Sequence, residues 1–350
     1  MKLVDVSGIG HSGKTAVSDL LKEVKDTTVH PSSFEFNLLR LTHGLIDLKN
    51  SVCENWSPIR SDYAVKNFLS LVEKLNKDYS NVLNINFKSC STNFVDTLIV
   101  GKLYTNWYDE YYTINRNQVI RLPIFFKKIA KIIFNIIGYK YGDTKIKQLV
   151  YLVENEKFDD KIKAYLHNIL FSNIGTSDYV VTHNAFEPFN PNISLNLFNE
   201  AYSIIVVRDP RDIYLSTINN HNIFIPEFES NSKVYSIKYL NDLKKDFLGS
   251  QDINLFIQRQ KLYWKNISHE KNKFVKVIYF EDLVLNYEAT INDIFSFLKI
   301  NKLHHDNKKK YFDPEKSRKN ILLWKNSSHR EELEILEKEL GKYFYEYAKK

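Results

Sequence analysis

The stretch Gly8-Ile9-Gly10-His11-Ser12-Gly13-Lys14-Thr15 is the most informative part of this chain. It follows the apolar run from Leu3 to Val6, which predicts a buried strand, and it precedes an amphipathic pattern from about Lys14 to Val24, which predicts a helix. A glycine-rich turn between a strand and a helix directs backbone N–H groups inward, and the helix N-terminus adds partial positive charge. The spacing Gly-x4-Gly-Lys-Thr therefore predicts a loop that holds phosphate or sulfate groups.

The residue types within this loop indicate how such a ligand is held. Lys14 can neutralise charge on a terminal phosphate or sulfate, which makes it a candidate catalytic residue. Thr15 can donate to phosphate or, in an NTPase, ligate Mg²⁺. We expect the ligand to contact the turn and the first helical turn, that is, Gly10, His11, Ser12, Gly13, Lys14, Thr15 and Ala16.

A second segment has the features of another phosphate site. Arg208-Asp209-Pro210-Arg211-Asp212 follows a short apolar run, and Ser216 lies eight residues after Arg208. Arginine offers a two-pronged donor to phosphate, and Ser216 falls in the first turns of the next predicted helix, where an anion is favoured. The alternative to a phosphate site is that Arg208, at the end of the strand, forms an ion pair with Asp209 or Asp212. Together the two segments indicate an enzyme that grips a nucleotide with phosphates at two ends.

The second segment resembles the 3′-phosphate-binding segment of sulfotransferases that use 3′-phosphoadenosine 5′-phosphosulfate (PAPS). In that family a strand-final Arg and a Ser eight residues later hold the 3′-phosphate, so the resemblance implies this role for Arg208 and Ser216. The later segment Ser317-Arg318-Lys319 is similar to the family's basic pair, which implies that Arg318 and Lys319 touch the same phosphate. The glycine that the family has after this pair is Asn320 here.

Two residues are candidates for the general base. Thr182-His183, after a predicted strand, resembles the Thr-His pair of cytosolic sulfotransferases, which implies that His183 accepts the acceptor proton. Other members have Thr-Pro there, and a strand-end His is otherwise a capping or core residue. Glu35 is the second candidate, because segment 33–48 resembles one in bacterial sulfotransferase-like proteins that also implies acceptor contacts for Arg40 and His43. An amphipathic helix with exposed charges is the alternative for this segment.

The order of predicted elements indicates an α/β fold. Short apolar strands at 178–182, 202–207 and 274–280 alternate with helical patterns, which predicts a three-layer sandwich with a central parallel sheet, P-loop sulfotransferase-like in the family's terms. We expect a single domain over residues 1–350, with a mainly helical insertion at 57–175 that shapes the acceptor site or forms a lid. The further predicted elements are helices at 57–78, 144–175, 281–300 and 329–349 and a strand at 82–87.

Composition sets further expectations. A net charge of +7 fits an anionic ligand and, equally, an ordinary basic surface, and we expect no nucleic-acid partner. Cys53 and Cys90 have no disulfide or metal-site spacing, which fits a reducing compartment such as the cytoplasm. We expect neither a signal peptide nor a membrane span. Residues 119–141 carry lysines and bulky apolar groups, and two uses fit them: contact with an anionic membrane surface, or packing on the core. The oligomeric state is not predicted.

The resemblance implies a function with specific alternatives. It implies transfer of a sulfuryl group from PAPS to a hydroxyl or amine of a small-molecule or glycan acceptor, with adenosine 3′,5′-bisphosphate as the product and no metal required. The aromatic and basic insertion favours a carbohydrate or glycolipid acceptor. Typical members have a hydroxyl residue where Lys14 stands, so an ATP-dependent kinase or NTPase that uses Mg²⁺ is the alternative. A nucleotide-binding adaptor without turnover is a third reading.

Overall fold

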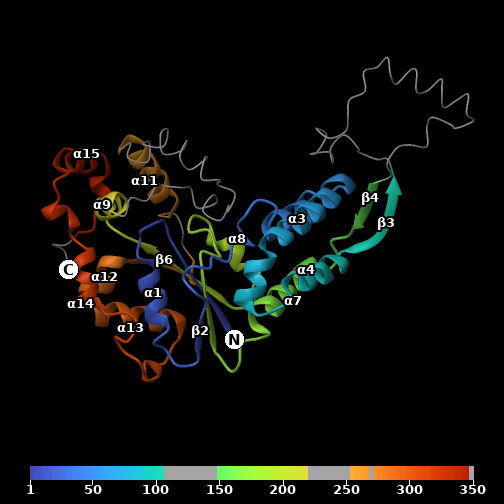
Figure 1. The fold of residues 1–350 in the computed structure, drawn as a ribbon, viewed down its shortest axis with the longest axis horizontal. Helices are drawn as coiled ribbons and strands as arrows, with labels where there is room; N and C mark the ends of the chain where they lie inside the picture. Colours follow the sequence, from blue (N-terminus) through green and yellow to red (C-terminus); the bar gives the residue numbers. More distant parts are fainter. Residues whose placement is uncertain (106–147, 220–252, 268–271, 347–350) are drawn as a thin grey trace, which may run out of the picture.

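The structure is a computed structural model that describes residues 1–105, 148–219, 253–267 and 272–346. Its centre is a five-stranded sheet in the order β2-β5-β1-β6-β7, in which every pairing is parallel (Figure 1). Strands β5 and β6 are buried at every position, as expected when helices cover both faces of a parallel sheet. The bounds are β1 (Lys2–Ser7), β2 (Thr27–Val29), β5 (Tyr179–His183), β6 (Ala201–Val207) and β7 (Val275–Tyr279).

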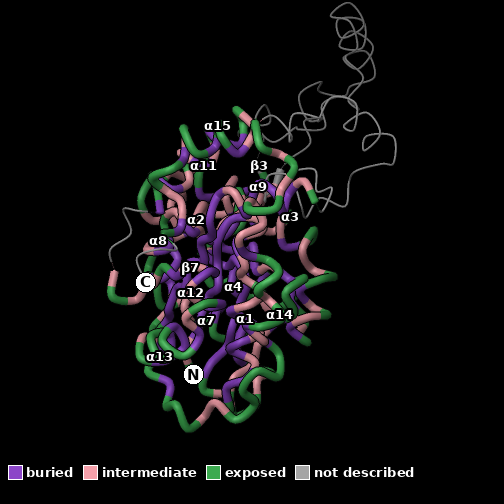
Figure 2. The backbone as a smooth tube through the Cα atoms, turned by 90° about the vertical axis from the view of Figure 1, so that its left-hand side faces the viewer, coloured by how far each residue is buried: buried purple, intermediate pink, exposed green. Residues whose placement is uncertain are grey.

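Helices cover the sheet on both faces, so the predicted three-layer α/β sandwich is confirmed. Apolar side chains of α1 (Lys14–Leu21), α12 (Phe280–Leu285) and α13 (Tyr287–Leu298) pack on one face with β-strand residues such as Val4 and Ile204. The other face packs against α3 (Pro58–Leu83), α4 (Phe87–Asp96) and α7 (Phe158–Phe171). The buried residues gather along the middle of the molecule, where the strands lie (Figure 2).

The region expected to be a helical insertion contains strands as well. After α3 and α4, β3 (Ile99–Thr105) pairs in antiparallel fashion with β4 (Gln148–Val153), and α7 follows. The helix predicted at 144–175 is therefore wrong in its first part, because the backbone of residues 148–153 bonds to β3. The part of this insertion that the structure describes extends away from the main sheet (Figure 1).

The strand predicted at 82–87 is also wrong. Helix α3 ends at Leu83, because Asn84 adopts the left-handed conformation with a φ of 52°. The side chain of Asn86 then accepts a hydrogen bond from the backbone N–H of Ser89, which caps α4. Two asparagines thus form a helix–turn–helix connection in a stretch whose alternating apolar residues suggest a strand.

The C-terminal part departs from the sequence prediction in detail. The helix expected at 281–300 is two helices, α12 and α13, and Asn286 lies between them. The helix expected at 329–349 is α15 (Arg330–Leu340), whose Leu336 and Leu340 are fully buried. The remaining elements are α2 (Leu45–Lys49), the π-helix η1 (Asn50–Glu54), α8 (Pro191–Leu195), α9 (Pro210–Asn219), α11 (Ile253–Ile267), α14 (Pro314–Ser317), and the 3₁₀ helices η4 (Lys302–His304), η5 (Arg318–Asn320), η6 (Leu323–Asn326) and η7 (Gly341–Tyr343).

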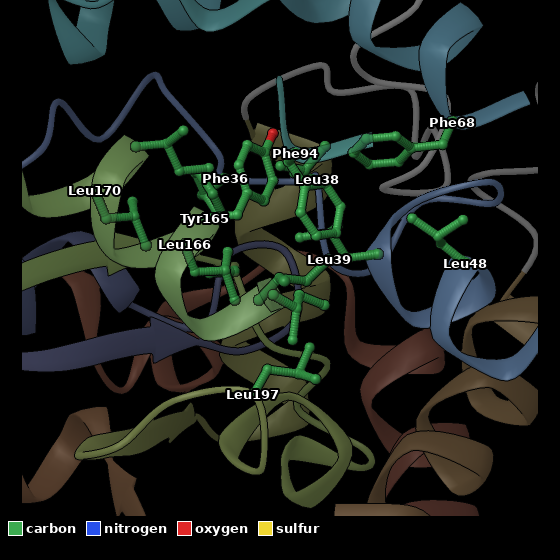
Figure 3. Close-up of a cluster of buried hydrophobic side chains, with 14 of the residues drawn as sticks. Phe36, Leu38, Leu39, Leu48, Phe68, Phe94, Tyr165, Leu166, Leu170 and Leu197 are labelled. Atoms are coloured by element: carbon green, nitrogen blue, oxygen red, sulfur yellow. The ribbon is translucent and has the colours of Figure 1, made fainter. Parts of the chain in front are cut away.

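A large apolar cluster fixes the segment that carries Glu35. Phe36, Leu38 and Leu39 are fully buried against helices α3, α4 and α7, together with Leu48 of α2 (Figure 3). The segment contains turns and one short helix rather than the amphipathic helix considered from its sequence. Its apolar side chains therefore hold it in place without regular secondary structure.

No helix among the described residues is long and apolar enough to cross a membrane. The segment 119–141, considered for membrane contact, lies outside the described residues.

Candidate active site

The glycines of the loop at residues 8–15 are required by its geometry. Gly8 and Gly13 have φ values of 154° and 94°, which L side chains rarely adopt. A Cβ atom on Gly8 would lie 2.4 Å from the carbonyl oxygen of Val206, and one on Gly13 would lie 2.5 Å from Cδ2 of Phe280. The loop can take this shape only because both positions lack a side chain.

The loop leads into a helix N-terminus that no side chain caps. Gly13 is the N-cap residue of α1 and offers no side-chain hydrogen bond. The first N–H groups of a helix have no intrahelical partner, so an anion can satisfy them. The hydroxyl oxygen of Ser12 is buried and has no hydrogen-bond partner among the described residues. These groups fit a phosphate or sulfate ligand.

A cleft of about 530 Å³ opens in front of this helix N-terminus. Its basic side chains are Lys14, Arg208, Lys310 and Lys316, and its acidic ones are Asp19 and Asp313. Asp19 is already paired with Lys22, at 2.7 Å, which leaves the lining positive on balance and favours an anionic ligand. The lining includes six of the seven predicted loop residues, from His11 to Ala16, but not Gly10.

Arg208 reaches this cleft from the end of β6. Its Nη1 donates to the carbonyl oxygen of His11 at 2.8 Å, its Nη2 donates to the carbonyl oxygen of Asn320, and its guanidinium lies 5.4 Å from the centre of the Phe280 ring. Only 5% of the residue is exposed. The two segments singled out in the sequence thus meet in one cleft, and Arg208 joins the loop to the C-terminal part of the chain.

The acidic residues after Arg208 attach the C-terminal segment. Arg211 pairs with Asp209 at 2.7 Å, and its guanidinium stacks on the rings of Trp324 and Phe344 at 3.8 and 3.9 Å. The carboxylate of Asp212 accepts hydrogen bonds from the backbone N–H groups of residues 322 and 323, both at 2.8 Å. Asp209 therefore pairs with Arg211, and the motif docks residues 320–345. Sequence reasoning missed this role of the motif.

Burial perturbs two carboxyl groups in this docking region. Burial, followed by the nearby Asp209 charge, raises the pKa of Asp212 to about 6. Burial also raises the pKa of Glu281 to about 8, although the carboxylate accepts a hydrogen bond from the N–H of Asp209 at 2.8 Å. Both carboxyl groups therefore favour the protonated form more than exposed carboxyl groups do.

Three predicted phosphate contacts lie outside the lining of the cleft. Ser216 is buried on α9, Lys319 is exposed, and Arg318 is exposed and pairs with Glu315 at 2.8 Å. Their neighbours Lys316, Ser317 and Asn320 do line the cleft, as do Lys310 and Tyr311. Lys310 belongs to the run of three lysines at 308–310, and such a run indicates a basic patch in the sequence.

His183 lies at the end of β5, under helix α1. It is 3% exposed, and its Nδ1 lies 3.3 Å from the hydroxyl oxygen of Ser18 in α1. Its Nε2 is buried and has no hydrogen-bond partner among the described residues. Burial, and then the positive charge of Lys14, lowers the pKa of His183 to about 4. His183 is therefore a neutral, buried side chain that does not line the cleft.

Glu35 lies near the same strand end but is more accessible. The backbone N–H of its neighbour Phe36 donates to the carbonyl oxygen of His183 at 3.1 Å, which brings both candidate bases to one edge of the sheet. The Glu35 carboxylate accepts hydrogen bonds from Arg40, at 2.9 Å, and from Asn184, at 2.6 Å. Its side chain is 24% exposed. These two donors fix the direction of a carboxylate that solvent can reach.

The molecule is thus an α/β protein with a cleft of positive charge balance, which a glycine-rich loop and a strand-end arginine line together. The sulfotransferase domain family matches residues 124–346, which is more than half of the chain, and the chain belongs to this family. Its members transfer sulfuryl groups, so the resemblance drawn from the sequence is confirmed at that level.

Two solved structures are similar to the chain. The sulfotransferase domain of the Synechococcus PCC 7002 olefin synthase has a TM-score of 0.38 and 11% identity, over 97% of this chain and 94% of that one. The sulfotransferase domain of the curacin biosynthetic pathway has a TM-score of 0.35 and 12% identity, over 97% and 96%. No curated protein matches the sequence. Among the described residues, no group of three or more His, Cys, Asp or Glu side chains could hold a metal ion.

Proposed function

We propose that this protein transfers a sulfuryl group from PAPS to a hydroxyl or amine of an acceptor, and that the product nucleotide is adenosine 3′,5′-bisphosphate. The observation that supports the proposal most is the meeting of Lys14, the uncapped N-terminus of α1 and Arg208 in one positive cleft. A nucleotide with several anionic groups matches a cleft lined by Lys14, Arg208, Lys310 and Lys316.

The donor would be held by residues that come from three parts of the chain. The loop from His11 to Ala16 would bind the 5′-phosphosulfate, and Arg208 would bind the 3′-phosphate with help from Lys310 and Lys316. Ser216, Arg318 and Lys319 are proposed as further 3′-phosphate contacts from the family resemblance alone. When bound, PAPS supplies an activated sulfuryl group, and we propose no metal for this step.

Side chains and backbone groups of the chain would stabilise the negative charge of the transition state and would remove one proton from the acceptor. Negative charge grows on the sulfate and bridging oxygens in such a transfer, and Lys14 with the N–H groups of α1 would stabilise it. We propose Glu35 as the general base that removes the acceptor proton, because its carboxylate is accessible and oriented. The neutral His183 is the second candidate, and its burial makes it the weaker one.

The acceptor that we propose is a carbohydrate or glycolipid. The aromatic and basic composition of the insertion supports this class, since aromatic rings stack on sugars and basic groups attract acidic glycans or headgroups. Cys53 and Cys90 are free, which is consistent with the reducing cytoplasm as the proposed location.

The competing function is a kinase or NTPase that uses Mg·ATP, because Lys14 and Thr15 both line the cleft. Isothermal titration with adenosine 3′,5′-bisphosphate without metal, and separately with Mg·ATP, distinguishes the two. Sulfuryl transfer predicts micromolar binding of the bisphosphate, lost in Arg208→Ala. Tight Mg·ATP binding that does not depend on Arg208, without bisphosphate binding, would overturn the proposal.

A further inference from the structure

A second pocket, of about 280 Å³, lies between α2, the π-helix η1 and helix α3. Its lining is mixed: Leu48 and Ala64 contribute apolar surface, and the polar side chains include His43, Asp47, Asn50, Arg60, Tyr63 and Asn67. It shares no lining residue with the nucleotide cleft. The pocket is therefore a separate place where a polar molecule can bind.

Two donors in this pocket have no partner among the described residues. The Nδ2 atom of Asn67 is buried and makes no hydrogen bond, which is unfavourable unless a ligand or water accepts from it. The guanidinium of Arg60, in the first turn of α3, makes no ion pair within the described parts of the chain. Both groups are thus available to a hydrogen-bond acceptor that enters the pocket.

The pocket also holds a charged acceptor. Asp47 accepts a hydrogen bond from the backbone N–H of His43 at 2.6 Å through one carboxylate oxygen, Oδ2. This bond fixes the direction of the carboxylate and uses only one of its two oxygens. One cation and one carboxylate balance each other, so the charges of Arg60 and Asp47 favour a neutral ligand that both donates and accepts hydrogen bonds.

The walls of the pocket are rigid. Gly44 is packed so closely that a Cβ atom there would lie 2.3 Å from the carbonyl oxygen of Leu38, and His43 has a φ of 69°. Leu45 and Leu48 of α2 are almost fully buried, Leu48 beside the apolar cluster of Figure 3. The adjoining π-helix is a rare backbone form that occurs often at functional sites. A pocket held in this way needs little ordering when a ligand binds.

The same chain segment joins this pocket to the proposed base. Arg40 contacts the Glu35 carboxylate at 2.9 Å, and His43 lies three residues further along. Three residues span at most about 11 Å even when fully extended. The pocket and the proposed base are therefore carried by one short stretch of chain.

We propose that this pocket binds a neutral sugar unit of the acceptor. Sugar hydroxyls donate and accept hydrogen bonds, so Asp47 would accept from them while Arg60 and Asn67 donate. The ring of Tyr63 offers an apolar face to the sugar ring. This inference rests on the proposed sulfuryl transfer and gives its acceptor a binding place.

The test measures the binding of simple glycosides by saturation-transfer NMR, with adenosine 3′,5′-bisphosphate present and absent. The probes are the methyl β-glycosides of glucose, galactose and N-acetylglucosamine, with methyl glucuronide and methyl glucosaminide as charged comparators. We expect at least one neutral glycoside to bind, and we expect Arg60→Gln and Asn67→Leu each to weaken it by about tenfold, the effect of losing a hydrogen bond. Lys77→Gln, which removes a charge from an exposed site on the same helix, is the control.

Three outcomes would overturn the inference: no glycoside binds, a charged comparator binds best, or Arg60→Gln leaves binding unchanged. Arg60 is exposed, so Arg60→Gln should still fold and can test the inference even if Asn67→Leu fails to fold. Bisphosphate affinity should be equal in all variants. If the bisphosphate fails to bind to the wild type while a glycoside binds in the pocket, the proposed function fails and the sugar site stands.

Discussion

The cleft in front of helix α1 and the Glu35 region are held in shape by different interactions. In the cleft, short motifs dictate the backbone, because Gly8 and Gly13 adopt conformations that side chains exclude. In the Glu35 region, residues 34–48 have little regular structure and are held by apolar side chains buried against distant helices. A sequence motif predicts a binding site where the backbone itself would contact the ligand. It does not predict a site whose side chains are positioned by the packing of distant apolar residues.

Replacing Lys14 should have the largest effect and tests the cleft side of the comparison. Lys14→Ala removes the cation at the N-terminus of α1, and we expect the rate of bisphosphate formation from PAPS, with saturating acceptor, to fall by about 10²–10³-fold. Bisphosphate affinity should change much less. Lys22→Ala is the matched control, because Lys22 directly follows the same helix, pairs with Asp19 and is not part of the cleft lining. A rate that survives Lys14→Ala would remove Lys14 from the catalytic residues.

Substitutions of the two candidate bases test the Glu35 region. We expect Glu35→Gln to lower the turnover rate by about 10²-fold or more, the usual size for a lost general base, and His183→Gln to lower it by less than about tenfold. The exposed Glu54→Gln serves as the control. The reverse order of effects would make His183 the base and would require its ring to leave the buried position beside Ser18.

Glycine substitutions test whether the cleft depends on its backbone. Gly13→Ala would force a Cβ atom against Phe280 at a left-handed position, a strain of about 1–3 kcal/mol. We expect a lower melting temperature and bisphosphate affinity reduced by about tenfold. Gly175→Ala, where a Cβ atom would meet nothing within 4 Å, should change neither quantity. Equal behaviour of the two variants would show that the loop is not rigid.

The last prediction concerns pH and the region where the C-terminal segment docks. Folding raises the pKa of Asp212 from 3.8 to about 6 and that of Glu281 from 4.5 to about 8, so the folded state favours the protonated forms. This stabilisation is complete below the ordinary values and is lost as the pH rises through about 6 and then about 8.

Thermal unfolding between about pH 5 and pH 9 measures this loss. We expect the melting temperature of the wild type to fall as the pH rises, and we expect Glu281→Gln to remove the upper part of the fall. Glu288→Gln, at an exposed site paired with Lys308, should follow the wild type. A wild-type melting temperature that rises across this range would contradict the assignment.

The sequence predicted the fold class and the centre of the cleft, because both depend on local patterns. The strands of the main sheet are apolar runs, and the loop residues His11 to Ala16 line the cleft as expected. The pairing of β3 with β4 and the pocket between α2 and α3 were not predictable, since they depend on residues brought together by packing. Lys310 and Lys316 reach the cleft because Asp212 and Arg211 dock a segment about a hundred residues away, which no local pattern encodes.

The central claim is that Arg208 binds the 3′-phosphate of the nucleotide in the same cleft in which the loop binds its 5′-phosphosulfate. The most direct measurement compares the affinity for adenosine 3′,5′-bisphosphate with that for adenosine 5′-monophosphate, which lacks the 3′-phosphate. A charged hydrogen-bonded contact of about 1.5–3 kcal/mol predicts a preference of about 10–150-fold in the wild type, which Arg208→Ala should abolish. Equal affinities in the wild type, or a preference unchanged in Arg208→Ala, would contradict the claim.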